Sequence, residues 1–116
     1  MRIAALDLGT NSFLCLIAEV SRAREFRVLH DESVIVRLGQ ELQKTGRLHP
    51  EALERARECL GQFHKTVQEL QVDRVQAVGC LGSNRWVIRC TASLFVCRKG
   101  SRFYLNQIIA YIYILV

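Results

Sequence analysis

The sequence predicts a mixed α/β domain in which a three-strand meander leads through a helix to a fourth strand. Short apolar segments separated by turn residues fill the first 38 positions, as in consecutive strands. From residue 50 onward, apolar residues recur at steps of three and four, which is the spacing of one helix face. A further apolar run follows that helix directly. The 116 residues suit one small domain.

The meander strands are expected to be antiparallel, because consecutive strands joined by tight turns normally pair. They are predicted at residues 3–6, 12–20 and 26–38, with turns at 8–11 and 21–24. The third strand is expected to break near residues 30–32, where His, Asp and Glu interrupt the apolar pattern.

A loop is expected at Gly39–Leu48, and a helix is predicted to begin at Pro50, because the missing N–H of proline costs nothing there. Its apolar stripe consists of Leu53, Ala56, Leu60, Phe63, Val67 and Leu70. The fourth strand is predicted at Val75–Val78. A strand reached through a helix is normally parallel to a neighbour and buried. The sequence therefore predicts a mixed sheet with a helix on one face.

The composition changes near Val78. Residues 1–78 contain eleven Lys and Arg and eleven Asp and Glu, whereas residues 79–116 contain five Lys and Arg and no acid. The net charge of +5 therefore belongs to the last third, and we expect no nucleic-acid partner. We predict a main segment at 1–78 and a divergent tail at 79–116, of the kind that out-of-frame translation produces. Within the tail, Trp86–Cys97 is compatible with a strand or a helix.

The cysteines lie at positions 15, 59, 80, 90 and 97, without metal-knuckle spacing and in odd number. We predict reduced thiols in a cytoplasmic protein. No run of about 20 apolar residues is present, so a membrane span is not expected. The three histidines, at 30, 49 and 64, follow no ligand spacing and are predicted as surface or capping residues.

The segment from Asp7 to Ser12 has the composition of a phosphate-binding turn. Gly9 lets the backbone approach a ligand closely, and Thr10, Asn11 and Ser12 supply side-chain donors. Asp7 can hold a divalent cation or orient water. The same residue types are favoured in plain hairpin turns for local reasons, so both interpretations stay open on these six residues.

Two longer blocks resemble the exopolyphosphatase/guanosine pentaphosphate phosphatase family. The first is ALDLGTNSFLCLIAEV, residues 5–20, and the second is VIVRLGQELQKTGRLHPEALERARECLGQF, residues 34–63. The second block, with Arg-Leu-Gly followed by Thr-Gly and an Arg-bearing helix, distinguishes this family from sugar kinases, actins and chaperones with a related phosphate loop. The resemblance covers residues 2–78.

This resemblance implies an α/β fold of the ribonuclease-H-like (actin-like ATPase) type. It also implies hydrolysis of terminal phosphoanhydrides in polyphosphate or guanosine pentaphosphate, with magnesium (Mg²⁺). In the implied site, Asp7 lies beside the metal or the attacking water, as catalytic and metal-binding residue. Phosphate contacts are implied for Gly9, Thr10, Asn11 and Ser12.

The resemblance ends at Val78, because Gly79–Arg85 does not match the Ala-Thr-Ser-Ala-x-Arg-like segment of the family. No acid follows Asp73, so the family's catalytic Glu and second phosphate loop have no counterpart here. We therefore expect a truncated hydrolase fragment that is inactive as given. The alternatives are a non-hydrolytic nucleotide- or phosphate-binding module of the actin-like superfamily, and a non-functional product that self-associates through its uncharged Tyr104–Val116 segment. Arg37 either reaches phosphate or is solvated at a strand end.

Overall fold

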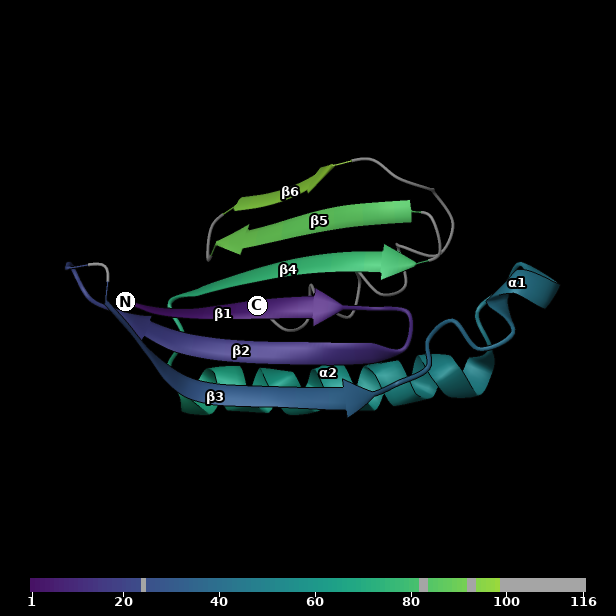
Figure 1. Ribbon diagram of the computed structural model, residues 1–116, viewed down its shortest axis with the longest axis horizontal. Coiled ribbons are helices and arrows are strands. Elements are labelled where there is room, and N and C mark those ends of the chain that lie inside the picture. Colours follow the sequence, from purple (N-terminus) through teal and green to yellow (C-terminus); the bar gives the residue numbers. More distant parts are fainter. Residues whose placement is uncertain (24, 82–83, 92–93, 99–116) are drawn as a thin grey trace.

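The computed structural model describes residues 1–23, 25–81, 84–91 and 94–98, with side chains described up to residue 79. Within these ranges the chain forms one mixed sheet in the order β3-β2-β1-β4-β5-β6, with a short and a long helix (Figure 1). The strands are β1 (Arg2–Leu8), β2 (Ser12–Val20), β3 (Phe26–Ile35), β4 (Arg74–Leu81), β5 (Asn84–Thr91) and β6 (Leu94–Arg98). The helices are α1 (Leu42–Thr45) and α2 (Pro50–Glu69).

Strand pairing confirms the predicted topology of the main segment. Strands β1, β2 and β3 form an antiparallel meander, and β4 pairs with β1 in parallel after the α2 crossover. The register places Asp7 of β1 between Leu14 of β2 and Val78 of β4. The residue that resembles a catalytic acid therefore lies in the middle of the sheet, near the C-terminal end of its strand.

Strand β3 runs through residues 30–32 without interruption, so the predicted break is wrong. Instead, the register shifts by one residue, because His30 pairs with Ile17 and Val28 with Ala18, which leaves Leu29 without a partner. Within the described residues β3 lies at the edge of the sheet, where charged side chains can reach solvent. Polar residues therefore interrupt the apolar pattern here without ending the strand.

Strand β4 crosses the composition boundary at Val78 and continues to Leu81. Strands β5 and β6 then extend the sheet by antiparallel pairing, so a strand is the observed alternative across most of Trp86–Cys97. The segment Tyr104–Val116, and any association through it, lie outside the described residues. The predicted loop at Gly39–Leu48 contains the single-turn helix α1, which the sequence analysis did not anticipate.

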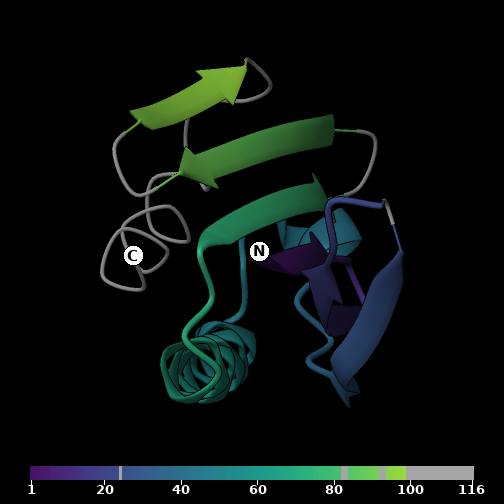
Figure 2. The same cartoon turned by 90° about the vertical axis from the view of Figure 1, so that its left-hand side faces the viewer.

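Helix α2 packs along one side of the meander (Figure 2). The core combines alternate residues of the strands with one face of the helix. It comprises Ala4, Leu6 and Leu8 of β1, Phe13, Cys15 and Ile17 of β2, and Ala56, Cys59, Leu60, Phe63 and Val67 of α2, together with Val36, Leu38, Leu48 and Ala77. Burial, reinforced by the Glu32 carboxylate, raises the pKa of the Cys15 thiol to about 11 and that of Cys59 to about 12. Both thiols are therefore protonated groups of the core.

Both ends of α2 are capped. At the N-terminus, Pro50 occupies the first helical position and the ring of His49 accepts a hydrogen bond from the Glu51 amide at 3.3 Å. At the C-terminus, the Gln71 amide donates to Gln68 and the Val72 amide to Val67, which is the Schellman arrangement. This arrangement requires a left-handed residue, and Gln71 supplies it with φ of 49°.

Replacing Gln71 by glycine should stabilise the protein by about 1 kcal/mol, because glycine adopts the left-handed conformation without the cost that a Cβ imposes. Urea unfolding followed by circular dichroism measures the change. The control is Gln62→Gly at an exposed position inside α2, where glycine should destabilise by about 1 kcal/mol. A loss of stability in Gln71→Gly would contradict the assignment of this cap.

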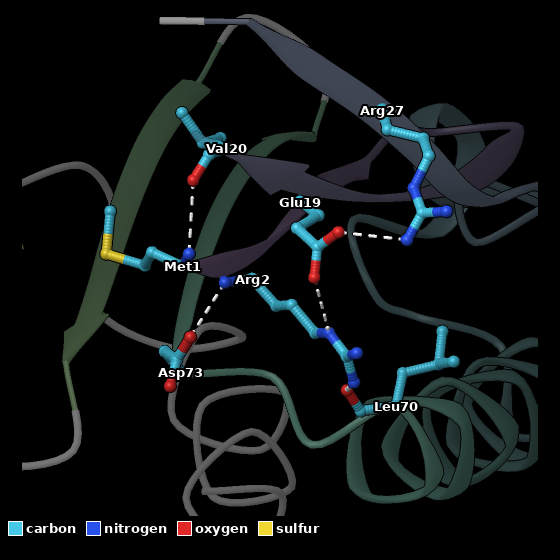
Figure 3. A network of polar contacts seen from close by, with 7 residues as sticks. All are labelled: Met1, Arg2, Glu19, Val20, Arg27, Leu70 and Asp73. Atoms are coloured by element: carbon cyan, nitrogen blue, oxygen red, sulfur yellow. Dashed lines mark hydrogen bonds and ion pairs between the residues drawn. The ribbon is translucent and has the colours of Figure 1, made fainter. Parts of the chain in front are cut away.

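A polar network ties the start of β1 to the end of α2 (Figure 3). The Arg2 guanidinium donates to the Leu70 carbonyl at 2.7 Å and to Glu19 at 3.4 Å, while the Arg2 amide donates to Asp73 at 2.7 Å. Arg27 also pairs with Glu19 at 2.9 Å, and the hydrogen bonds from Arg27 and Arg2 lower the pKa of Glu19. The network fixes the helix against the sheet at the end opposite to Asp7.

No helix in the described ranges is both long enough and apolar enough to traverse a bilayer.

Candidate phosphate-binding site

Residues 9–11 form the tight connection between β1 and β2, and Asp7 and Ser12 lie at the adjoining ends of these strands. The closing hydrogen bond of this turn runs from the Gly9 amide to the Ser12 carbonyl at 3.0 Å. A Cβ on Gly9 would lie 2.8 Å from that carbonyl oxygen, so this turn accommodates only glycine without rearrangement. Because its N–H is used within the turn, Gly9 contributes to a ligand site through its lack of a side chain.

The turn is also hydrogen-bonded to the chain that follows β3. The Asn11 carbonyl accepts hydrogen bonds from the amides of Val36 at 2.9 Å and Arg37 at 2.7 Å. The Thr10 carbonyl accepts one from the Gly39 amide at 2.9 Å. We call residues 36–40 the buttress segment. Figure 1 shows the turn and the C-terminal end of β3 at the same end of the sheet.

These hydrogen bonds orient two peptide units of the turn. In a planar trans peptide, the carbonyl of one residue and the N–H of the next point in opposite directions, and the described residues contain no cis bond. Since the carbonyls of Thr10 and Asn11 face the buttress segment, the amides of Asn11 and Ser12 face away from it. Two neighbouring N–H groups directed to the same side attract an anion.

The buttress segment is in turn held in place by a side chain of α2. Arg55 donates through Nε to the Val36 carbonyl at 2.8 Å and through Nη2 to the Gln40 side chain at 2.7 Å. Val36 and Leu38 are buried, at 0% and 1% exposure. The position of the turn thus depends on hydrogen bonds from residues 36–39, and the position of this segment depends on Arg55.

Asp7 presents an exposed carboxylate on the face of the sheet that α2 does not cover. Among the described residues, no three His, Cys, Asp or Glu side chains gather in a way that would hold a metal ion. Mg²⁺ in phosphoryl-transfer sites is typically held by one or two carboxylates, water and the phosphates of the substrate. The single accessible carboxylate of Asp7, beside this turn, fits that mode of binding.

The predicted site residues lie together as expected for one turn: Asp7, Thr10 and Asn11 are exposed, and Gly9 and Ser12 are half-buried. Sequence reasoning missed the contact of Arg55 with the buttress segment and the contact of Gly39 with the turn. The Arg-Leu-Gly motif at residues 37–39 was the available signal. Only the fold shows that this motif touches residues 10 and 11.

Comparison with known proteins matches residues 16–81 to the Ppx/GppA phosphatase family. The chain is 42% identical over 80 residues to Exopolyphosphatase 2 of Mycobacterium tuberculosis. It is 36% identical over 77 residues to the guanosine-5'-triphosphate,3'-diphosphate pyrophosphatase of Aeromonas hydrophila. These alignments cover 66% of this chain but 25% and 15% of the relatives.

Among solved structures, the Ppx/GppA family member of Aquifex aeolicus superimposes with a TM-score of 0.65 and 30% sequence identity. This superposition covers 68% of the chain and 26% of the Aquifex protein. The chain thus spans about a quarter of the length of its first relatives. The similarity confirms the expected ribonuclease-H-like, actin-like fold of the main segment.

Proposed function

The chain belongs to the Ppx/GppA phosphatase family, and from this premise we propose that the Asp7–Ser12 turn holds the terminal phosphate of a phosphoanhydride chain. The names of the relatives support inorganic polyphosphate or guanosine pentaphosphate as the chemical class of substrate. The observation that carries the proposal is the set of hydrogen bonds from residues 36–39 to the carbonyls of Thr10 and Asn11, from which we infer that the amides of Asn11 and Ser12 face away from the buttress segment.

In this proposal the roles of the turn residues follow from their chemistry. The amides of Asn11 and Ser12, with the Thr10, Asn11 and Ser12 side chains, bind phosphate oxygens. Gly9 leaves the approach open, and Asp7 would hold Mg²⁺ or orient the attacking water. When bound, the metal ion supplies positive charge that offsets the charge of the phosphates.

We further propose that this chain does not hydrolyse its ligand by itself. In-line phosphoryl transfer depends on groups positioned around both the attacking and the leaving oxygen. No Asp or Glu follows Asp73, and Asp7 cannot both hold a metal ion and act as general base in the correct geometry. A non-hydrolytic phosphate-binding module is the alternative function, supported by the same turn.

Two further properties belong to the proposal. The free thiols of Cys15 and Cys59 are compatible with the reducing environment of the cytoplasm. Self-association is supported by large apolar side chains that remain exposed on the sheet, among them Leu14, Leu16 and Val28.

The proposal is tested by titrating the chain with pyrophosphate and Mg²⁺ while following amide chemical shifts. We expect millimolar binding that shifts Gly9 and Thr10, because one turn supplies only part of a phosphate site. Asp7→Ala should abolish the Mg²⁺-dependent component. The control is Asp31→Ala, which removes the same charge from the exposed face of the sheet. This variant should keep the Mg²⁺-dependent component of binding.

The outcomes separate the parts of the proposal. Absence of any shift at Gly9 and Thr10 would contradict phosphate binding by the turn. Phosphate release from polyphosphate or guanosine pentaphosphate above a protein-free blank, lost in Asp7→Ala, would contradict the proposed inactivity and refute the non-hydrolytic alternative.

A further inference from the structure

Arg37 has an unusual backbone conformation and an exposed side chain, and its amide is hydrogen-bonded to the proposed phosphate turn. Its φ of 51° is left-handed, a conformation that costs a residue other than glycine about 1 kcal/mol or more. Two buried neighbours, Val36 and Leu38, fix the chain on either side. Arg55 holds the Val36 carbonyl from behind, and the Arg37 amide binds the Asn11 carbonyl at 2.7 Å. The surrounding contacts therefore hold Arg37 in a strained conformation.

The guanidinium of Arg37 differs from those of Arg2, Arg27 and Arg55. Each of those three makes hydrogen bonds or ion pairs within the fold. The side chain of Arg37 is exposed, and among the residues that the structure describes it has no hydrogen-bond or ion-pair partner. An exposed cationic side chain is thus carried, at a cost in backbone strain, by a residue whose amide binds the Asn11 carbonyl.

We propose that Arg37 binds the second or third phosphate of an extended phosphate chain whose terminal phosphate lies in the Asp7–Ser12 turn. This inference rests on the proposed function of that turn. The planar guanidinium can bind phosphate oxygens with two parallel hydrogen bonds. The ligand class is a linear polyphosphate anion of three or more phosphates. Arg37 then determines preference for chain length, while the turn alone binds a single phosphate.

The test compares orthophosphate with tripolyphosphate, each with Mg²⁺, by chemical-shift titration of the whole chain. Wild type should bind tripolyphosphate more tightly than orthophosphate. Arg37→Gln should weaken tripolyphosphate binding about tenfold, the value of one charge-assisted contact, and leave orthophosphate binding unchanged. Arg37→Lys should retain part of the preference, because it keeps the charge but not the planar donor pair.

Arg22→Gln is the matched control, because it removes the same charge at the β2–β3 turn, at the opposite end of β2. Its effect should be small, since exposed charges separated by more than about 10 Å are screened at 0.1 M salt. Arg37→Gly adds a second readout: it should unfold at higher urea concentration than wild type, because the strain is relieved, yet lose the preference for tripolyphosphate.

Equal effects of Arg37→Gln and Arg22→Gln on tripolyphosphate binding would overturn the inference while the turn still binds orthophosphate. If neither ligand shifts Gly9 and Thr10 in wild type, the proposed function of the turn fails, and this inference fails with it. A titration with GTP distinguishes an inorganic polyphosphate from the phosphates of a nucleotide. If Arg37→Gln weakens the binding of GTP as much as that of tripolyphosphate, Arg37 recognises the phosphates alone.

Discussion

Phe63→Ala should lower the free energy of unfolding by about 3–5 kcal/mol, a large part of the 5–15 kcal/mol that holds a typical small domain together. Phe63 is 1% exposed and belongs to the core between α2 and the meander. Alanine removes the ring and leaves a cavity that the sheet cannot collapse to fill, because both layers are held by backbone hydrogen bonds. Urea unfolding followed by circular dichroism measures the loss.

Phe26→Ala is the matched control for this prediction. The same atoms are removed from a side chain that is 72% exposed on β3, so we expect a change within about 0.5 kcal/mol. Similar losses in the two variants would mean that the α2 interface is not the core of the molecule. If Phe63→Ala has lost most of the native circular-dichroism signal even without urea, the loss of stability lies at the upper end of the predicted range.

The position of Phe63 could be predicted from the sequence because helical periodicity alone places it on the buried face. Leu60 and Val67 follow from the same spacing and are also buried. Ala52 and Cys59, which lie beside that stripe, are also buried, since the face that packs on a twisted sheet is wider than one row of residues. A hydrophobicity pattern identifies the centre of such a face more reliably than its margins.

Strand β3 shows where a local pattern is insufficient. The charged residues at 30–32 predicted a break, but the hydrogen bonds to β2 continue past them. His30 and Glu32 lie on the same side of the strand, two residues apart, and pair with each other at 3.0 Å. Whether charges end a strand depends on its place in the sheet, which is a tertiary property.

The candidate site likewise has one part that the sequence identifies and one part that only the fold shows. Asp7–Ser12 could be identified from composition and from the resemblance, because all of its residues are contiguous. The support that Gly39 and Arg55 give to the turn could not be identified in this way. Gly39 contacts Thr10, about 30 residues away in the sequence, and Arg55 contacts Val36, 19 residues away. No periodicity encodes which loop lies against which turn.

Gly39→Ala should destabilise the protein by about 1–3 kcal/mol and abolish the pyrophosphate-induced shifts of Gly9 and Thr10. A Cβ on Gly39 would lie 2.1 Å from the Cγ2 methyl of Thr10, well inside van der Waals contact. We expect this overlap to displace the turn from the buttress segment and to break the hydrogen bond from the Gly39 amide to the Thr10 carbonyl. The amides of Asn11 and Ser12 then no longer share one direction.

Thr10→Ser should rescue this variant, because serine lacks the Cγ2 methyl but keeps the hydroxyl. The remaining contacts of the added Cβ, to the Thr10 Cβ and carbonyl oxygen, are both at the ordinary distance of 3.6 Å. The double variant should therefore recover most of the lost stability and the shifts at Gly9. Gly61→Ala, at a helical position with no atom within 4 Å of the new Cβ, should instead stabilise by about 1 kcal/mol. Additive losses in Gly39→Ala and Thr10→Ser would show that residues 39 and 10 do not touch, and the buttress would then have no part in shaping the phosphate turn.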